Sequence, residues 1–275
     1  MTTLRKSVIA IALCTLAASG SAWAQSAATD TSTYKPTVGQ AGKDVVWVPT
    51  AQTLVDRILD MAKLTPEDKL VDLGSGDGRT VITAAKRGAT ARGIEFNPDM
   101  VAISKRAAAA EGVTARATFE QADIFQSDFS NATVVTLFLL PDLNVRLRPT
   151  LLAMKPGTRV VSNSFMMGDW QPDESSQVKE DCTNYCNAYK WIVPAQIEGA
   201  WKLGDKDVSF DQRYQKFEGS LRQGGQATPI TEGSLDGTRI AFTAGSDKYA
   251  GEVNGNQIKG TINGQTAWTA TRAAR

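Results

Sequence analysis

The feature that most constrains the fold is a glycine-rich segment between a short apolar run and a helical pattern. Residues 71–80 read VDLGSGDGRT; the apolar run covers 69–73 and the helical pattern 80–86. Glycines allow the backbone to turn sharply and to approach a ligand that a Cβ would exclude. A strand that leads through such a loop into a helix begins a βαβ unit. The segment therefore predicts a parallel sheet whose ligand site lies beyond the carboxyl ends of its strands.

The same alternation of strand and helix patterns continues over residues 45–205, which predicts an α/β domain with a Rossmann-like sheet. We expect Thr50 to cap the first helix, Gly88 to end the second, and Asn97-Pro98-Asp99 to begin the third. Two late strands are expected to close the sheet as an edge hairpin. The expected helices are 54–62, 80–86, a helix after 97 and 142–154, and the expected strands are 69–73, 91–96, 117–121, 132–139, 159–164, 189–193 and 199–203.

Residues 206–275 lack the helical period and predict a small all-β C-terminal domain. Short alternating runs are separated by turn dipeptides, which favour a meander of about six strands, as a barrel or a twisted sheet. The dipeptides are Gly224-Gly225, Asp236-Gly237, Gly245-Ser246, Asn254-Gly255 and Asn263-Gly264.

The glycine spacing narrows the expected ligand. Gly74, Gly76 and Gly78 follow a Gly-x-Gly-x-Gly pattern, and Arg79 stands where a dinucleotide-binding loop needs its third glycine. A pyrophosphate ligand is thereby disfavoured. Glu95, at the end of the next predicted strand, is placed to accept hydrogen bonds from both hydroxyls of a ribose, so we expect a nucleoside ligand.

Three motifs in order resemble class I S-adenosylmethionine (SAM)-dependent methyltransferases: residues 72–78, the run Gly93-Ile94-Glu95-Phe96-Asn97-Pro98, and Ala122-Asp123-Ile124. The resemblance implies SAM as the cofactor and Asp123 as the acceptor for the adenine amino group. The alternative is a Rossmann-like sheet without a nucleoside ligand. The implied cofactor-binding residues are Asp72, Gly74, Ser75, Gly76, Asp77, Gly78, Glu95, Phe96, Asn97, Asp123 and Ile124.

Further motifs resemble the archaeal and mitochondrial seven-strand protein-lysine methyltransferases. They are Val48-Pro49-Thr50, residues 134–141 (VVTLFLLP) and Leu147-Arg148-Pro149. Many amino methyltransferases carry an Asn/Asp-Pro-Pro-Tyr motif after the fourth strand, where this chain has Leu139-Leu140-Pro141-Asp142. The resemblance implies methylation of a protein lysine amine and argues against base or glutamine methylation. The leader and the β-rich tail are not part of that family's usual pattern.

The candidate acceptor-site residues are Leu139, Leu140, Pro141, Asp142 and Asn163. Methyl transfer mainly requires positioning in a closed site, so no acid/base pair is obligatory. Asp142 either helps to deprotonate the amine or serves the helix dipole as a first-turn acid. Asn163 either lines the acceptor pocket or caps a turn. The function predicted is an exported methyltransferase acting on a protein; the alternatives are a small-molecule methyltransferase and an exported binding or structural protein without turnover.

Charge and composition exclude several other functions. The formal net charge is +1 and becomes −1 without residues 1–24, which hold Arg5 and Lys6 and no acid. We therefore expect no nucleic-acid partner. The chain contains no histidine, which excludes a histidine-based catalytic triad and any histidine-ligated metal, and we expect no metal site.

Residues 1–24 have the three parts of a secretory signal peptide: Arg5-Lys6, an apolar run from Val8 to Ala18, and Ala22-Trp23-Ala24. We expect cleavage after Ala24 and export, to the bacterial periplasm; an uncleaved anchor is the alternative. Residues 25–44 are expected to form a flexible linker. No later stretch is long and apolar enough to span a bilayer, so no span is expected in the mature chain.

The mature chain retains two cysteines, Cys182 and Cys186. An even count in an oxidising compartment favours a disulfide between them, and their spacing is too wide for a CxxC redox motif. Two free buried thiols are the alternative.

Overall fold

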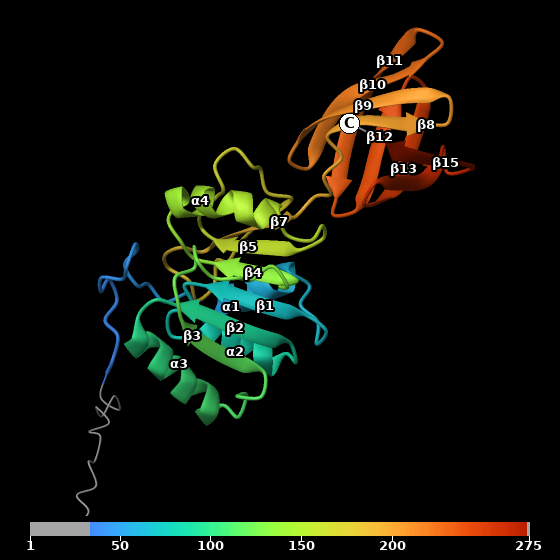
Figure 1. The fold of residues 1–275 in the computed structure, drawn as a ribbon. Coiled ribbons are helices and arrows are strands. Elements are labelled where there is room, and N and C mark those ends of the chain that lie inside the picture. Colours follow the sequence, from blue (N-terminus) through green and yellow to red (C-terminus); the bar gives the residue numbers. More distant parts are fainter. Residues whose placement is uncertain (1–33, 274–275) are drawn as a thin grey trace, which may run out of the picture. The chain divides into compact units, whose positions relative to one another are not determined.

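The computed structural model describes residues 34–273, so the predicted leader and the first part of the predicted linker lie outside the described residues. Seven strands form one mixed sheet in the order β3-β2-β1-β4-β5-β7-β6 (Figure 1). They are β1 (Lys69–Leu73), β2 (Thr90–Glu95), β3 (Ala117–Gln121), β4 (Val134–Leu137), β5 (Arg159–Asn163), β6 (Glu174–Gln177) and β7 (Asn187–Ile192). Strands β1 to β5 run parallel, β7 runs antiparallel to β5, and β6 runs antiparallel to β7. The predicted Rossmann-like α/β fold is confirmed.

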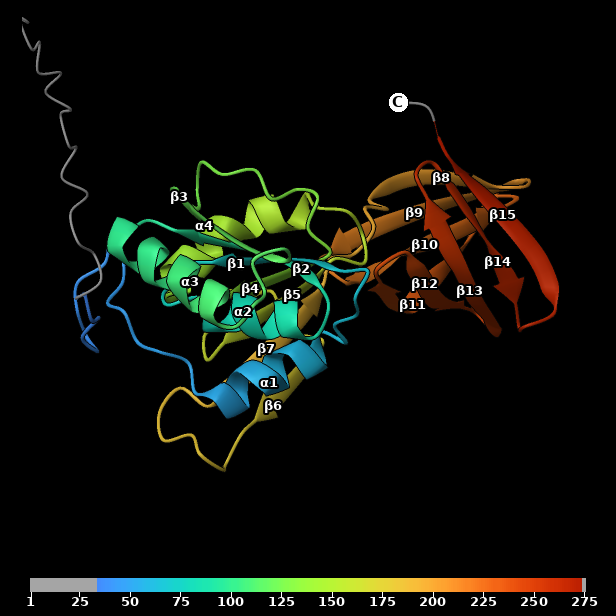
Figure 2. The ribbon, with the colours of Figure 1, turned by 90° about the horizontal axis from the view of Figure 1, so that it is seen from below.

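Helices cover both faces of the sheet, because strand residues alternate between two cores. Leu70, Val134 and Val161 pack with α1 (Gln52–Met61), α2 (Arg79–Lys86) and α3 (Pro98–Ala110). Their neighbours Val71, Val135 and Val160 pack instead with α4 (Pro141–Leu152). Figure 2 shows α4 on one side of the sheet and α1 and α2 on the other. This two-sided burial leaves the strand ends as the place for a ligand.

The residues predicted to begin or end helices do so at α2 and α3 but not at α1. The Asn97 side chain accepts a hydrogen bond from the Asp99 amide at 2.9 Å, and Pro98 occupies the first turn of α3. Gly88, with φ +97°, follows α2 as expected. The prediction for Thr50 is wrong: α1 is preceded by Ala51 and has no side-chain cap. The Thr50 hydroxyl instead accepts a hydrogen bond from Asn163, a tertiary contact.

The predicted edge hairpin is wrong in one of its strands. Strand β7 pairs with β6, a short exposed strand that the sequence pattern missed. The other expected strand, β8 (Gly199–Leu203), pairs with the C-terminal strands, because Trp201 and Leu203 are buried in that second core. The C-terminal all-β unit therefore begins at Gly199 rather than at residue 206.

The C-terminal unit is a closed barrel in which consecutive strands are neighbours, so the barrel form of the predicted meander is confirmed; it has eight strands rather than about six. The predicted turn dipeptides all lie at its hairpin turns; residues 206–272 form seven strands, and β8 is the eighth, which closes the barrel by pairing with β15 and β9. Aromatic rings, including Phe210, Phe242 and Trp268, fill its interior. The remaining strands are β9 (Lys206–Arg213), β10 (Lys216–Gln223), β11 (Gln226–Asp236), β12 (Arg239–Ala244), β13 (Asp247–Asn254), β14 (Gln257–Ile262) and β15 (Thr266–Arg272).

Candidate functional site

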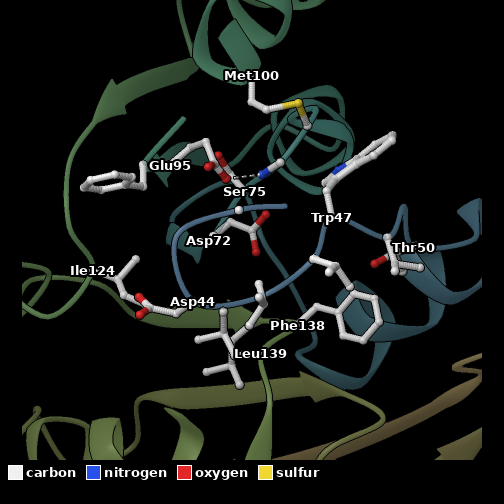
Figure 3. Close-up of a pocket in the computed structure, with 18 of the residues that line it drawn as sticks. Asp44, Trp47, Thr50, Asp72, Ser75, Glu95, Met100, Ile124, Phe138 and Leu139 are labelled. Carbon is white, nitrogen blue, oxygen red and sulfur yellow. Dashed lines mark hydrogen bonds between the residues drawn. The ribbon is translucent and has the colours of Figure 1, made fainter. Parts of the chain in front are cut away.

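One cavity of about 500 Å³ lies at the carboxyl ends of β1 to β5. Its lining includes residues from the glycine-rich loop after β1, from the ends of β2 and β3, and from the segments after β4 and β5. In Figure 3, Asp72 lies between Glu95 on one side and Phe138 and Leu139 on the other. The carboxyl ends of the parallel strands thus bring residues of the predicted nucleoside site and of the predicted acceptor site to one cavity.

The glycine-rich loop needs glycine for two different reasons. Gly74 and Gly76 line the cavity with φ of +78° and +53°. A Cβ on Gly76 would lie 2.7 Å from Nε1 of Trp47, which packs over the loop. Gly78 does not line the cavity; it precedes α2 with φ +80°, and a Cβ there would lie 2.7 Å from the Phe119 ring. Its role is close packing of helix against sheet, and the expectation that it contacts the ligand is corrected.

Backbone amides hold the Glu95 carboxylate at the cavity. Oε2 accepts a hydrogen bond from the Gly76 amide and Oε1 from the Asn97 amide, each at 2.9 Å. A carboxylate has about four acceptor positions, so each oxygen can accept a further bond. Two adjacent, fixed acceptor oxygens fit the paired hydroxyls of a ribose.

The serine of the glycine-rich loop has a buried, unpaired hydroxyl. Ser75 Oγ is buried and has no hydrogen-bond partner within residues 34–273. Its residue lines the cavity between the Gly74 and Gly76 turns. A Cβ at Gly93 would lie 2.5 Å from this oxygen, so the hydroxyl faces the backbone of β2 rather than the ligand space.

Asp72, at the floor of the cavity, is buried, with an exposed fraction of 7%. Burial is the main cause that raises its pKa to about 7; the nearby carboxylates Glu95 and Asp77 raise it further, and the hydrogen bond from Thr136 Oγ1 opposes the shift. A cationic ligand would favour the ionised form. The Asp72 carboxylate would therefore attract a positively charged ligand group.

We expect the raised pKa of Asp72 to make the protein less stable as pH rises. An acid with a native pKa above its unfolded value stabilises the fold fully below the unfolded value and loses that contribution through the native one. Relative to Asp72→Asn, the ligand-free protein should lose up to about 4 kcal/mol of unfolding free energy between pH 4 and pH 8. Urea titrations across this range would measure the difference. Asp211→Asn, which removes an exposed barrel carboxylate, is the control; a pH-independent difference for Asp72→Asn would contradict the prediction.

Asp123 and its neighbours are held by a segment that sequence patterns assigned to the linker. Asp123 Oδ2 forms an ion pair of 2.6 Å with Lys43, and its Oδ1 accepts a hydrogen bond from the Phe125 amide. The hydrogen bond from Lys43 is the main cause that lowers the pKa of Asp123. The Lys43 amine also lies 4.9 Å from the centre of the Phe96 ring. The carboxylate expected to meet an adenine amino group is thus engaged by a lysine.

Residues 40–50 line much of the cavity, so the predicted linker 25–44 is corrected for its last residues. Ala41 and Val46 form an antiparallel bridge, and the Gly39 amide donates to the Trp47 carbonyl at 2.8 Å. The apolar run from Val45 to Val48 is the signal that this segment packs against the domain. The residues just before this apolar run resemble a linker because the turn that they form consists of glycine and polar residues.

The predicted acceptor residues are only partly brought to the cavity. Leu139, Leu140 and Asn163 line it, as do Ile124 and Asn97 among the predicted cofactor residues. Pro141 and Asp142 do not, because they form the first turn of α4, and Asp142 is its first-turn acid. The helix-dipole interpretation of Asp142 therefore agrees with its position, and a direct role in amine deprotonation does not.

Replacing Glu95 should test the nucleoside end of the cavity. Glu95→Ala removes acceptors for ribose hydroxyls and for the Gly76 amide, so SAM binding should weaken by about 5- to 150-fold, or about 1 to 3 kcal/mol. Isothermal calorimetry measures this directly. Glu120→Ala, on β3 and outside the cavity lining, should bind SAM normally. Equal affinity of the Glu95 variant and the unchanged protein would refute the assignment.

Comparisons with known proteins agree with this geometry. The family model described as ANTKMT methyltransferase domain matches residues 72–174. A protein-lysine N-methyltransferase of Saccharolobus islandicus is 40% identical over 152 residues, which are 54% of this chain and 94% of that protein. The adenine nucleotide translocase lysine N-methyltransferase of Mus musculus is 35% identical over 46% of this chain and 56% of its own length.

A solved structure is also similar: an RNA methyltransferase from Salinibacter ruber in complex with S-adenosyl-L-homocysteine, with a TM-score of 0.51 and 45% identity. The match covers 55% of this chain and 96% of that one. The fixed Glu95 carboxylate and the glycine turns fit S-adenosylmethionine as cofactor. The chain is a SAM-dependent methyltransferase and belongs to the class I methyltransferase family of the Saccharolobus islandicus protein.

Proposed function

We propose that the protein is exported and transfers a methyl group from SAM to the side-chain amine of a lysine in a protein. The observation that carries the proposal is the apolar end of the cavity, formed by Phe138, Leu139, Leu140 and Phe165 after β4 and β5. A lysine side chain is a four-methylene stem with a terminal amine, and its stem packs well along apolar surface. A planar amide or base would need polar partners that this end of the cavity mostly lacks.

The residues act mainly by positioning. SAM supplies an electrophilic methyl group on a positively charged sulfur. Residues at the ends of β1 and β2, with Glu95 and Ser75, would hold it, and the apolar residues after β4 would orient the stem of the acceptor. The amine must arrive neutral, and the Leu139 carbonyl oxygen is a candidate to orient its N–H bonds, whereas the Leu140 carbonyl accepts hydrogen bonds from the Leu143 and Asn144 amides. Exclusion of water by the segment 40–50 would favour the transfer.

The relatives support a lysine acceptor, since proteins described as lysine N-methyltransferases match this chain in the region of the site. The similar Salinibacter ruber protein is described as an RNA methyltransferase. RNA binding generally requires a basic surface, whereas this chain has a net charge of +1, and −1 without its first 24 residues. We therefore favour protein over RNA as the acceptor.

Two observations support export: the signal-peptide pattern of residues 1–24 and the Cys182–Cys186 disulfide, which suits an oxidising compartment. The predicted pairing of these cysteines is confirmed. Within residues 34–273, no helix is long and apolar enough to cross a membrane. Intact-mass analysis of protein from the periplasmic fraction should show a chain that begins at Gln25; retention of Met1 to Ala24 would refute cleavage.

Methyl transfer can be tested with labelled SAM and an envelope extract from the native host. Label should appear on protein and, after hydrolysis, in methyllysine. The Glu95→Ala variant at limiting SAM should reduce it. Label confined to small molecules or to RNA would refute the lysine proposal, and absence of label despite measured SAM binding would refute transfer to envelope proteins.

A further inference from the structure

We propose that Tyr185, presented by the disulfide-closed loop 182–186, completes an aromatic subsite with Phe138 and Phe165 that binds the alkylammonium group of the methyl acceptor. The proposal deepens the proposed function, on which it rests for the identity of the acceptor. It adds a specificity-determining residue that lies outside the glycine-rich loop and the segment after β4.

Three rings from separate elements meet at one end of the cavity. Phe138 follows β4, Phe165 follows β5, and Tyr185 lies in the loop before β7. The Phe138 and Tyr185 ring centres are 5.3 Å apart at an interplanar angle of 61°, and those of Phe165 and Tyr185 are 5.9 Å apart at 53°. Phe138 and Phe165 are more nearly parallel, at 6.1 Å and 21°. The Tyr185 ring thus stands across the other two as a third wall.

Core packing does not explain this cluster. The three rings are absent from the hydrophobic cores on either face of the sheet, and Tyr185 is 46% exposed. Large aromatic surfaces left open at a ligand cavity commonly mark a binding site. Aromatic ring faces attract cations within about 6 Å, and such groups of rings recognise methylated ammonium ions.

A buried asparagine forms part of the same cavity wall. Asn163 lines the same cavity, is 1% exposed, and donates from Nδ2 to the Thr50 hydroxyl at 3.1 Å. Its Oδ1 has no hydrogen-bond partner within residues 34–273. The Asn163 side chain therefore belongs to the wall of the cavity at Thr50, and the rings are the contact proposed for the head group.

Methyl transfer creates a positive charge on the acceptor nitrogen, which aromatic ring faces can stabilise. The neutral amine attacks the methyl carbon, the N–C bond forms as the C–S bond breaks, and positive charge moves from sulfur to nitrogen. The methylated ammonium then releases a proton to solvent if a further methyl is to be added. Ring faces beside the nitrogen stabilise the charge as it develops, which lowers the barrier as well as retaining the acceptor.

The disulfide determines where Tyr185 stands. The loop between Cys182 and Cys186 is closed by the disulfide, and its base is held by a hydrogen bond of 2.9 Å from the Val178 amide to the Cys186 carbonyl. Tyr185 itself has a φ of +58°, in the left-handed region that a residue with a Cβ rarely adopts. An open loop would have many alternatives to this conformation, and the cross-link removes them.

Binding measurements test the subsite independently of turnover. The probe is Nα-acetyl-Nε-trimethyllysine methylamide, compared by calorimetry with its isostere in which carbon replaces the ammonium nitrogen, on disulfide-intact protein saturated with S-adenosylhomocysteine. The cation should bind about 3- to 30-fold more tightly than the isostere. Tyr185→Phe should keep this preference, Tyr185→Ala should lose most of it, and Thr183→Ala, in the same loop, should not alter it. Equal binding of the two compounds, or equal behaviour of the two Tyr185 variants, overturns the proposal.

Reduction tests the role of the loop. Dithiothreitol converts the disulfide to two thiols and is oxidised to its cyclic disulfide; reduced protein should show the weakened cation binding of Tyr185→Ala, with SAM affinity unchanged. The double variant Cys182→Ser, Cys186→Ser should bind the cation as weakly as the reduced protein does, and adding dithiothreitol should not change its affinity. Full cation binding after reduction overturns the role of the disulfide.

The subsite and the proposed function can fail separately. If cation preference is found but no protein lysine is methylated, only the proposed function fails. If lysine is methylated without cation preference, only this subsite fails.

Discussion

Replacing Leu140 by arginine should nearly abolish methyl transfer while SAM still binds. Leu140 lies directly before α4, is 47% exposed and lines the acceptor end of the cavity. A guanidinium there would place an unpaired charge against apolar groups and would oppose the positive charge that develops on the acceptor nitrogen, a cost of about 3 kcal/mol. That cost corresponds to a fall of about 100-fold or more in kcat/KM for the acceptor.

The fold should tolerate this change. Leu140 makes no side-chain cap, so α4 loses no hydrogen bond, and the added charge at the helix start costs only about 0.3 to 1 kcal/mol. Val145→Arg is the matched control, because Val145 is 37% exposed on the same helix but lies outside the cavity lining. Initial rates and SAM calorimetry would be measured for both. A Leu140→Arg protein with more than about a tenth of the activity, or with SAM affinity lowered more than about threefold, would show that Leu140 does not act on the acceptor alone.

Replacing Gly260 by alanine should destabilise the barrel by about 3 kcal/mol or more. Gly260 in β14 is paired with Gly251 in β13. A Cβ at Gly260 would lie 1.9 Å from the Ala250 carbonyl oxygen and 2.5 Å from the Gly251 Cα. Both are backbone atoms of the neighbouring strand, so the clash can be relieved only by separating the two strands, which breaks their hydrogen bonds.

Urea titration gives the free energy of unfolding for this variant. Gly255→Asn is the control: Gly255 lies in the turn between the same two strands with φ +56°, a Cβ there would meet nothing within 4 Å, and asparagine tolerates this backbone conformation. The control should unfold within about 1 kcal/mol of the unchanged protein. A Gly260→Ala protein equally close to it would mean that the strands can separate without cost.

Features encoded by neighbouring residues could be predicted. The strand, loop and helix over residues 69–86 follow from an apolar run, glycines and a helical pattern that lie side by side in the chain. The start of α3 follows from Asn97 and Pro98, whose effects reach only a few residues. The barrel turns follow from glycine dipeptides for the same reason.

Features that depend on partners far away in the chain could not be predicted from the sequence. Strand β6 has the sequence ESSQ with mostly exposed residues, so no apolar alternation marks it, and it exists because β7 offers an edge. Strand β8 has a strand pattern that fits either sheet, and only the burial of Trp201 and Leu203 among barrel residues assigns it. Gly260 resembles any strand glycine until the position of Ala250 is known.

The sequence by itself determined the order of strands and helices from α1 to β5, the glycine loop and the carboxylate at the end of β2, because each depends on local backbone preferences and a period of burial. Only the tertiary structure decided what surrounds the ligand. It placed Lys43 on Asp123, moved Pro141, Asp142 and Gly78 out of the cavity lining, and brought Tyr185 to two rings from other strands. These contacts join residues far apart in the chain, and no local propensity specifies which distant surfaces meet.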